Sequence, residues 1–330
     1  MGRYVIHGAG AIGGLIGARL ALSGREVALL ARGAHLEAIA RDGLRVMTPE
    51  ADEVVRLPVA EGPSAIGLAP GDTIILAMKT QDAVAALPDL AGAAPPGVTV
   101  VCAQNGTENE RMALRLFEHV HGALVYCTAA LDGPGRVCGY NIPSLGVIDV
   151  GRYPAGVDET DARLAEDLRA AGFDSVAQPD IMRWKRGKLV LNSISNAVRA
   201  LVAPGDPDVA DLHRDLQAEI ERCYRAAGID YASREELTRR AGETMRVAPV
   251  GGRPWPGGST FQSMARGART SEVDYLNGEI TLLGRLHGAA TPLNRAIQQL
   301  MRDALASGAG QGTFRVVDIR ERAADAGDPG

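Results

Sequence analysis

The fold is decided at the start of the chain, where Tyr4-Val5-Ile6-His7 runs directly into Gly8-Ala9-Gly10-Ala11-Ile12-Gly13-Gly14. An apolar run, a Gly-x-Gly-x-x-Gly motif and a second apolar stretch over residues 15–22 predict a strand, a tight turn and a helix. Gly8 allows the turn, Gly10 lets a pyrophosphate approach the backbone, and Gly13 lets the helix pack closely on the strand. The N–H groups and the dipole at the helix start then face the phosphates. We therefore assign dinucleotide binding to the loop of Gly8, Ala9, Gly10, Ala11, Ile12 and Gly13.

The chain has 330 residues, which is enough for two domains with separate cores. A net charge of −5 without a basic block argues against nucleic acid or a membrane surface as partner. No apolar run approaches the roughly 20 residues of a membrane span, and no leader precedes the first strand, so we expect a cytoplasmic protein. The cysteines form neither a C-x-x-C pair nor a cluster with histidine, which predicts reduced thiols and no metal site: Cys102, Cys127, Cys138 and Cys223.

The second predicted strand, residues 26–32, ends in Arg32. In dinucleotide-binding folds the end of this strand meets the adenosine ribose, and an Asp or Glu there favours NAD. A guanidinium instead fits a 2′-phosphate through charge-assisted hydrogen bonds. The sequence therefore predicts NADP(H) as cofactor, with a solvated surface arginine as the alternative.

Two further apolar runs, residues 73–78 and 98–103, predict buried parallel strands. The first is followed by Lys79 and Gln81, and the second by Gln104 and Asn105. Because ligands bind at the carboxyl ends of such strands, we expect these side chains near the nicotinamide and the substrate. The alternative is ordinary turn chemistry, since Asn-Gly is a common turn.

Strand and helix alternation stops around residues 178–180, where long helices begin. We therefore predict an α/β protein with an N-terminal Rossmann domain over residues 1–179 and an all-helical domain over 180–318. Residues 319–330 are charged, rich in Ala and Gly and aperiodic, which indicates a mobile tail. The aliphatic C-terminal helices leave two possibilities open, a homodimer surface or a domain core.

The helix predicted from residue 181 carries a polar row at a spacing of four: Trp184, Lys188, Asn192 and Asn196. At 3.6 residues per turn these side chains lie nearly above one another, while the other faces are apolar. Buried polar groups need partners, so the row indicates either a structural network or a surface that faces a substrate. Lys185 competes with Lys188 for a catalytic role but lies off the face of the two asparagines.

These landmarks together resemble the ketopantoate reductase (2-dehydropantoate 2-reductase) family. The resemblance runs from Val5 to about Gln299 and includes Gln104-Asn105-Gly106 and Glu272-Val273-Asp274-Tyr275-Leu276-Asn277-Gly278. It implies a Rossmann domain, a helical domain, NADPH as hydride donor and a small 2-oxo acid as acceptor.

The resemblance also implies roles for individual residues. Lys188 matches the catalytic lysine, and Asn105 matches an asparagine near nicotinamide and substrate, with Lys79 and Gln81 on the cofactor side. Asn192 and Asn196 match substrate-binding amides. Glu272 matches the carboxylate that holds the substrate's hydroxyl group, next to the cofactor. The substrate's serine falls on Ser259 when counted from Gln262 and on Thr260 when counted from Glu272, and both are retained.

Three functions follow as hypotheses. The first is reduction of ketopantoate to pantoate, with Lys188 as proton donor. The second keeps the fold and the cofactor but takes another 2-oxo acid or an opine-type substrate. The third is a non-catalytic NADPH sensor, against which the row of Lys188, Asn192 and Asn196 speaks, because a sensor needs no proton donor.

Overall fold

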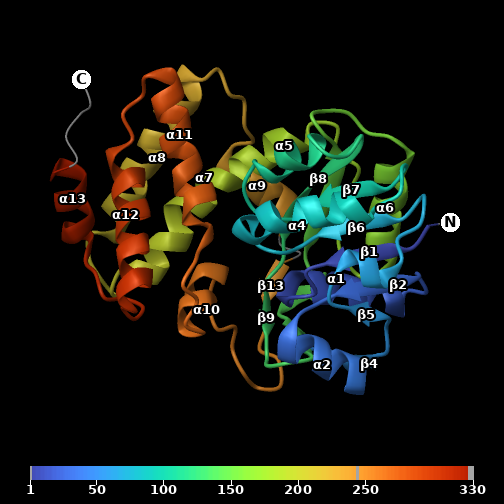
Figure 1. Ribbon diagram of the computed structural model, residues 1–330. Coiled ribbons are helices and arrows are strands. Elements are labelled where there is room, and N and C mark those ends of the chain that lie inside the picture. The colour runs from blue at the N-terminus through green and yellow to red at the C-terminus, as the bar shows by residue number, and fades with distance from the viewer. Residues whose placement is uncertain (1, 243–244, 326–330) are drawn as a thin grey trace. The chain divides into compact units, whose positions relative to one another are not determined.

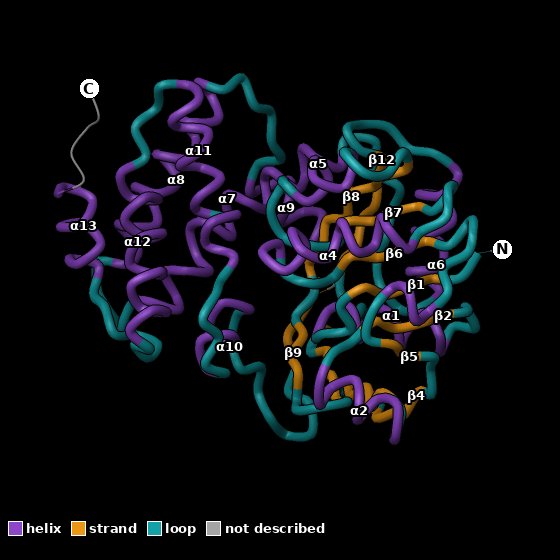
Figure 2. Tube along the Cα trace, in the orientation of Figure 1, coloured by secondary structure: helices purple, strands orange, loops and turns teal. Residues whose placement is uncertain are grey.

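The computed structural model describes residues 2–242 and 245–325. The chain divides into two compact units (Figures 1 and 2). The N-terminal unit comprises Met1–Lys185 and Glu235–Trp255, and the helical unit comprises Arg186–Arg234 and Pro256–Gly330. Within the described residues, no helix has both the length and the apolar character needed to cross a membrane.

The N-terminal unit is built on a seven-stranded sheet in the order β12-β8-β7-β6-β1-β2-β5, in which only β12 runs antiparallel to its neighbour. The predicted apolar strands are buried because helices cover both faces of such a sheet. The strands are β1 (Tyr4–His7), β2 (Val27–Leu30), β5 (Val59–Ala60), β6 (Thr73–Leu76), β7 (Thr99–Cys102), β8 (His119–Tyr126) and β12 (Val147–Arg152).

Two separate cores lie on the two faces of this sheet. Side chains alternate along β1, so Ile6 packs with α1 (Ala11–Leu22) and α6 (Glu159–Ala170), while Val5 packs with the helices opposite. Those opposite helices are α3 (Pro63–Ile66), α4 (Thr80–Ala93) and α5 (Asn109–Leu114). The helix α2 (Gly33–Asp42) follows β2 and contacts β5. The α/β Rossmann prediction is confirmed.

Smaller sheets complete the N-terminal unit. A four-stranded sheet has the order β4-β3-β10-β9, and all four of its strands contact α1. A two-stranded sheet pairs β11 with β13. The elements are β3 (Leu44–Met47), β4 (Asp52–Val55), β9 (Ala129–Leu131), β10 (Arg136–Gly139), β11 (Asn141–Pro143), β13 (Met245–Val247) and the helix α9 (Arg234–Ala241).

The domain boundary differs from the one predicted at residue 179. The N-terminal unit continues to Lys185, inside α7 (Ile181–Leu201), and the chain returns to it over Glu235–Trp255. A buried charge explains why the chain returns to the N-terminal unit. Asp149 of β12 is fully buried, and Arg240 of α9 donates hydrogen bonds to both of its carboxylate oxygens at 2.6 and 2.8 Å. A buried carboxylate needs such a partner, which α9 supplies.

The named elements of the helical unit are all helices, as predicted, and their apolar faces form one core. From the sequence, the apolar faces of these helices could have formed either a dimer surface or a domain core. In the structure they pack inside the unit. The homodimer stays a prediction. Besides α7, the helices are α8 (Val209–Ala226), α10 (Ser259–Ala265), the 3-10 helix η1 (Glu272–Tyr275), α11 (Asn277–His287), α12 (Pro292–Ser307) and α13 (Val316–Asp325).

The expected mobile tail is wrong for residues 319–325, which belong to α13. Val316 and Ile319 are fully buried in the helical core, and Arg320 pairs with Asp215 of α8 at 2.7 Å. Two buried aliphatic side chains one turn apart are enough to fix a helix whose composition otherwise suggests disorder. Residues 326–330 lie outside the described part of the chain.

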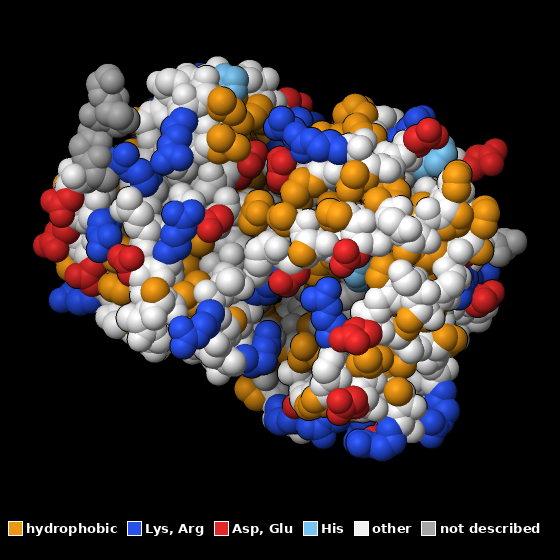
Figure 3. Space-filling view, viewed as in Figure 1, with side chains coloured by type: hydrophobic (Ala, Val, Ile, Leu, Met, Phe, Trp, Pro, Cys, Tyr) orange, Lys and Arg blue, Asp and Glu red, His pale blue; other side chains and the backbone are white. Residues whose placement is uncertain are grey.

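Charged side chains are mixed on the surface. On the face drawn in Figure 3, Lys and Arg lie interspersed with Asp and Glu over the described residues. Exposed ion pairs of the chain include Arg45 with Asp52 and Arg302 with Asp274. The face thus matches the moderate net charge of the sequence.

The close contact of β1 and α1 can be tested with two alanine substitutions. A Cβ at residue 13 would clash with the Gly8 carbonyl oxygen and come within 2.8 Å of the Ala77 methyl group, whereas a Cβ at residue 10 meets no atom within 4 Å. We expect Gly13→Ala to lower the free energy of unfolding by about 1–3 kcal/mol through overpacking. Gly10→Ala should leave it within about 0.5 kcal/mol. Urea unfolding checks both, and equal loss in the two variants would contradict this account.

Candidate active site

The glycine loop has the geometry that the sequence predicts. Gly8 adopts a φ of 100°, which favours glycine, and the N–H groups of Gly8 and Ala9 both donate to the Leu30 carbonyl, at 3.2 and 3.0 Å. The Gly13 backbone fits against Gly8 only because it has no side chain. The three glycines therefore serve three different needs: a positive φ, an open approach and close packing.

The start of α1 suits an anion. Gly10 is the N-cap and no side chain caps the helix, while the first helical hydrogen bond runs from the Gly14 N–H to the Gly10 carbonyl at 2.7 Å. The N–H groups of residues 11–13 therefore point out of the helix end, and the space next to Gly10 is open. These residues fit the pyrophosphate of a dinucleotide, which would occupy the place that a Cβ at residue 10 would fill.

Arg32 lies where β2 meets α2, exposed at the N-cap of that helix. Its positive charge, together with the larger effect of burial, lowers the pKa of His7 to about 4. His7 at the end of β1 is therefore neutral at physiological pH. The guanidinium of Arg32 remains the cation at this strand end that can meet a 2′-phosphate.

His35 is a positioning residue that the sequence analysis did not identify. Its ring accepts a hydrogen bond from the Gly135 N–H at Nδ1 (2.9 Å), so Nε2 carries the proton and donates to the Ala9 carbonyl at 2.7 Å. The imidazole thus holds the glycine loop from α2. The sequence offered one signal for His35, namely that it is a polar residue in the first helical turn after Arg32.

The predicted polar side chains after β6 and β7 lie at one edge of the sheet. The two strands are adjacent and parallel, with Leu76 opposite Cys102. The Asn109 amide joins the loops that follow them, because its Nδ2 donates to Thr80 Oγ1 at 3.0 Å and to the Asn105 carbonyl at 3.3 Å. Lys79 is the N-cap of α4, and Gln81 follows in its first turn. The structure therefore brings Lys79, Gln81 and Asn105 to one region of the N-terminal unit.

The polar row of α7 is half-buried, and the helix is continuous as predicted. Leu189, Val190 and Ile194 lie in the helical core, whereas Lys188, Asn192 and Asn196 share the row beside them. Among the described residues, the buried Nδ2 of Asn192 has no hydrogen-bond partner. A buried amide nitrogen without a partner is unusual in a purely structural network. The row therefore fits a surface that binds a ligand.

A buried polar network holds this part of α7. The Asn277 side chain donates to the Ser193 carbonyl at 2.8 Å and to Asn294 Oδ1 at 2.9 Å. Asn294 in turn donates to Glu219, which is 1% exposed and whose pKa is raised by burial. The Asn277 and Glu219 side chains fix α7 against α8, α11 and α12.

The remaining predicted residues also lie in the helical unit. Ser259 and Thr260 open α10, where Ser259 is exposed and Thr260 is buried. Glu272 is buried at the start of η1, for which Ser271 is the N-cap, its hydroxyl accepting from the Val273 N–H at 3.3 Å. The predicted residues thus form two groups: a cofactor group in the N-terminal unit and a group in the helical unit that comprises Lys188, Asn192, Asn196, Ser259, Thr260 and Glu272.

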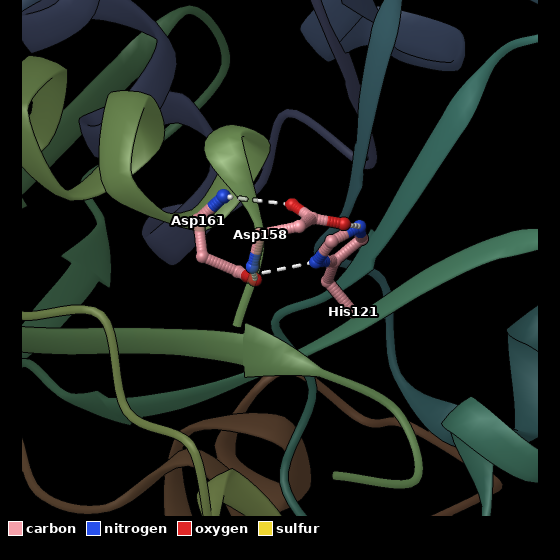
Figure 4. A group of neighbouring side chains, drawn as sticks. All are labelled: His121, Asp158 and Asp161. Atoms are coloured by element: carbon pink, nitrogen blue, oxygen red, sulfur yellow. Dashed lines mark hydrogen bonds and ion pairs between the residues drawn. The ribbon is translucent and has the colours of Figure 1, made fainter. Parts of the chain in front are cut away.

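A cluster of possible metal ligands is explained by helix capping (Figure 4). Asp158 accepts hydrogen bonds from the N–H groups of Thr160 and Asp161, and Asp161 accepts from the Asp158 N–H and from the His121 ring at 2.7 Å. These bonds form a capping box at the start of α6. The same carboxylates that could hold a cation are already committed to the helix end. The absence of a metal site stays a prediction.

Comparison with known proteins identifies the family. Residues 4–154 match the family model described as ketopantoate reductase PanE/ApbA, and residues 180–304 match its C-terminal counterpart. A 2-dehydropantoate 2-reductase of Mesorhizobium japonicum is 30% identical over 335 residues, covering 91% of this chain and 97% of the relative. One of Halobacterium salinarum is 30% identical over 309 residues, covering 91% and 98%.

Solved structures give the same result. A PanE/ApbA family ketopantoate reductase from Ralstonia eutropha JMP134 has a TM-score of 0.78 and 31% identity, covering 93% of this chain and 99% of that one. A D-mandelate dehydrogenase, solved with NADH and anilino(oxo)acetate, shares the fold with a TM-score of 0.79 at 23% identity, covering 93% and 99%. The glycine loop, the polar strand ends and the polar row of α7 thus occur in a chain that belongs to the ketopantoate reductase family of oxidoreductases.

Proposed function

We propose that this chain reduces 2-dehydropantoate to pantoate, with NADPH as hydride donor and Lys188 as proton donor. The observation that carries the proposal is the row on α7, which combines an ammonium group with two amides. One of these amides has a buried nitrogen without a partner among the described residues. This is the donor set that a 2-oxo acid requires, because a carboxylate and a ketone oxygen both accept hydrogen bonds.

The cofactor is bound by the N-terminal unit. The uncapped helix start at residues 11–13 would hold the pyrophosphate, and Arg32 would hold the 2′-phosphate. Lys79, Gln81 and Asn105 at the strand ends would hold the nicotinamide side. When bound, NADPH supplies the hydride, and the protein supplies position and charge.

Lys188 acts on the ketone oxygen. Hydride addition places negative charge there, and an ammonium group within hydrogen-bond reach stabilises this charge and donates the proton. Asn192 and Asn196 orient the substrate without adding charge. Asn105 contacts the substrate beside the nicotinamide, Glu272 accepts from the terminal hydroxyl group, and Ser259 or Thr260 provides a further hydroxyl contact.

Lys185, the other lysine considered as proton donor, makes structural contacts. Its ammonium group forms an ion pair with the fully buried Glu110 and donates to two backbone carbonyls. All three of its donors therefore have partners inside the N-terminal unit. Lys185 therefore has a structural task that competes with a role as proton donor.

A second candidate is the reduction of another 2-oxo acid or an opine-type substrate by the same residues. A protein with this fold is named D-mandelate dehydrogenase, which supports this candidate. A non-catalytic NADPH sensor is disfavoured by the row on α7, since binding a dinucleotide needs neither a proton donor nor the two amides.

The proton donor is tested by Lys188→Ala. We expect kcat for NADPH oxidation with 2-dehydropantoate to fall by at least roughly 100-fold, the lower end of general acid catalysis. The Kd of NADPH, measured by fluorescence titration, should stay within about threefold, which also shows that the variant is folded. Turnover near that of the unsubstituted enzyme would remove Lys188 from this role.

Cofactor choice is tested by Arg32→Glu. The substitution replaces a cation that attracts the 2′-phosphate with an anion that repels it, so KM for NADPH should rise by at least about tenfold more than KM for NADH. Arg56→Glu, at another exposed arginine of the same unit, changes the net charge equally and serves as control. Equal effects of Arg32→Glu on the two cofactors would show that Arg32 does not read the phosphate.

A further inference from the structure

A buried ion pair lies beneath the loop that follows β7. Glu110, in the first turn of α5, is fully buried, and Lys185 of α7 is 3% exposed. The Lys185 ammonium pairs with the Glu110 carboxylate and also donates to the carbonyls of Cys102 at 3.2 Å and Gln104 at 2.9 Å. An ammonium group has three donors, so the three partners satisfy it completely.

The residues around this ion pair leave space for its two side chains, and the pairing favours their charged forms. Burial raises the pKa of Glu110, and the adjacent Lys185 opposes that rise and favours the ionised form. In β8, a Cβ at Gly122 would come within 3.2 Å of Glu110 Oε1 and 3.5 Å of Lys185 Cδ. A glycine at this position of the strand therefore leaves room for both side chains.

The bonds of this pair converge on Asn105. Lys185 holds the carbonyl of the preceding residue, Gln104, and Asn109 holds the carbonyl of Asn105 itself and links it to Thr80. Glu110 follows Asn109 directly in α5, so the pair also fixes the helix from which Asn109 reaches back. Both ends of the short segment that carries Asn105 are thus held by buried groups, whereas Gly106, with a φ of 82°, provides the turn.

We propose that Lys185 and Glu110 are positioning residues that clamp the segment 102–110 and thereby hold Asn105 in its productive place. This inference rests on the proposed role of Asn105 at the nicotinamide and the substrate. A pair that served stability alone could be replaced by well-packed apolar residues at little cost. The two carbonyls that Lys185 binds give it a local task that an apolar pair cannot perform.

The test is the double variant Lys185→Met/Glu110→Met, which removes both charges together and so leaves no unpaired buried ion. Two quantities are measured: hydrogen–deuterium exchange of peptides covering residues 102–110, and kcat with NADPH and 2-dehydropantoate. We expect exchange to become at least about tenfold faster, as local opening is released. We expect kcat to fall by at least about tenfold, because small displacements of a positioned group are costly.

Two controls separate a clamp from general destabilisation. Binding of 2′,5′-ADP, which lacks the nicotinamide, should stay within about threefold, since the glycine loop and Arg32 are unchanged. Arg240→Met/Asp149→Asn removes another buried ion pair of the same unit, whose hydrogen bonds do not reach residues 102–110. This control should leave both the exchange of that segment and kcat unchanged.

The outcomes are distinct. A folded double variant with unchanged exchange, or with faster exchange and unchanged kcat, overturns the proposal. If the unsubstituted enzyme does not turn over 2-dehydropantoate, the proposed function fails, while the exchange measurement still decides whether the clamp exists. If the double variant does not fold, Gly122→Ala crowds the pair from β8 while keeping both charges, and the same two changes are expected in smaller measure.

Discussion

The structure of the N-terminal unit depends on the close contact of two backbone segments, the end of β1 and the first turn of α1. The helix can approach only because residue 13 has no Cβ, which would otherwise clash with the Gly8 carbonyl and the Ala77 side chain. This contact aims the uncapped N–H groups of α1 at the open space beside Gly10. The close packing and the open, uncapped helix start therefore have one origin: absent side chains at two positions of the same motif.

Away from this motif, buried and half-buried polar groups hold the elements that carry the candidate residues. His35 holds the glycine loop, the pair of Lys185 and Glu110 holds the segment of Asn105, and Glu219 with Asn277 holds α7 beside Asn192. Each group is costly to bury and is compensated by several hydrogen bonds. Such networks fix side-chain position within narrow limits, which hydride and proton transfer require.

Local patterns in the sequence predict those helices, strands and turns that are determined by neighbouring residues. The glycine motif, the apolar strands and the spacing of Lys188, Asn192 and Asn196 follow from periodicity and from the needs of the backbone, and the structure has the predicted elements there. The compact units divide the chain at other residues than 179, because the return of α9 to the N-terminal unit depends on a long-range contact, that of Arg240 with Asp149, ninety-one residues apart. The helix α13 was missed because two buried aliphatic residues in a charged segment give little periodicity. The pairing of Lys185 with Glu110 likewise joins distant segments, so the sequence could show only that Lys185 lies off the row of asparagines.

Under the proposed function, the chain reduces 2-dehydropantoate with NADPH, using the donors of the polar row of α7 and of the glycine loop. The most direct measurement is kcat/KM for NADPH oxidation with 2-dehydropantoate, compared with a panel of other 2-oxo acids under the same conditions. We expect 2-dehydropantoate to give the highest value, by at least about tenfold, the lower end of the discrimination that a single substrate group provides. A higher value for another acid in the panel, or tight NADPH binding without turnover of any of them, would contradict it.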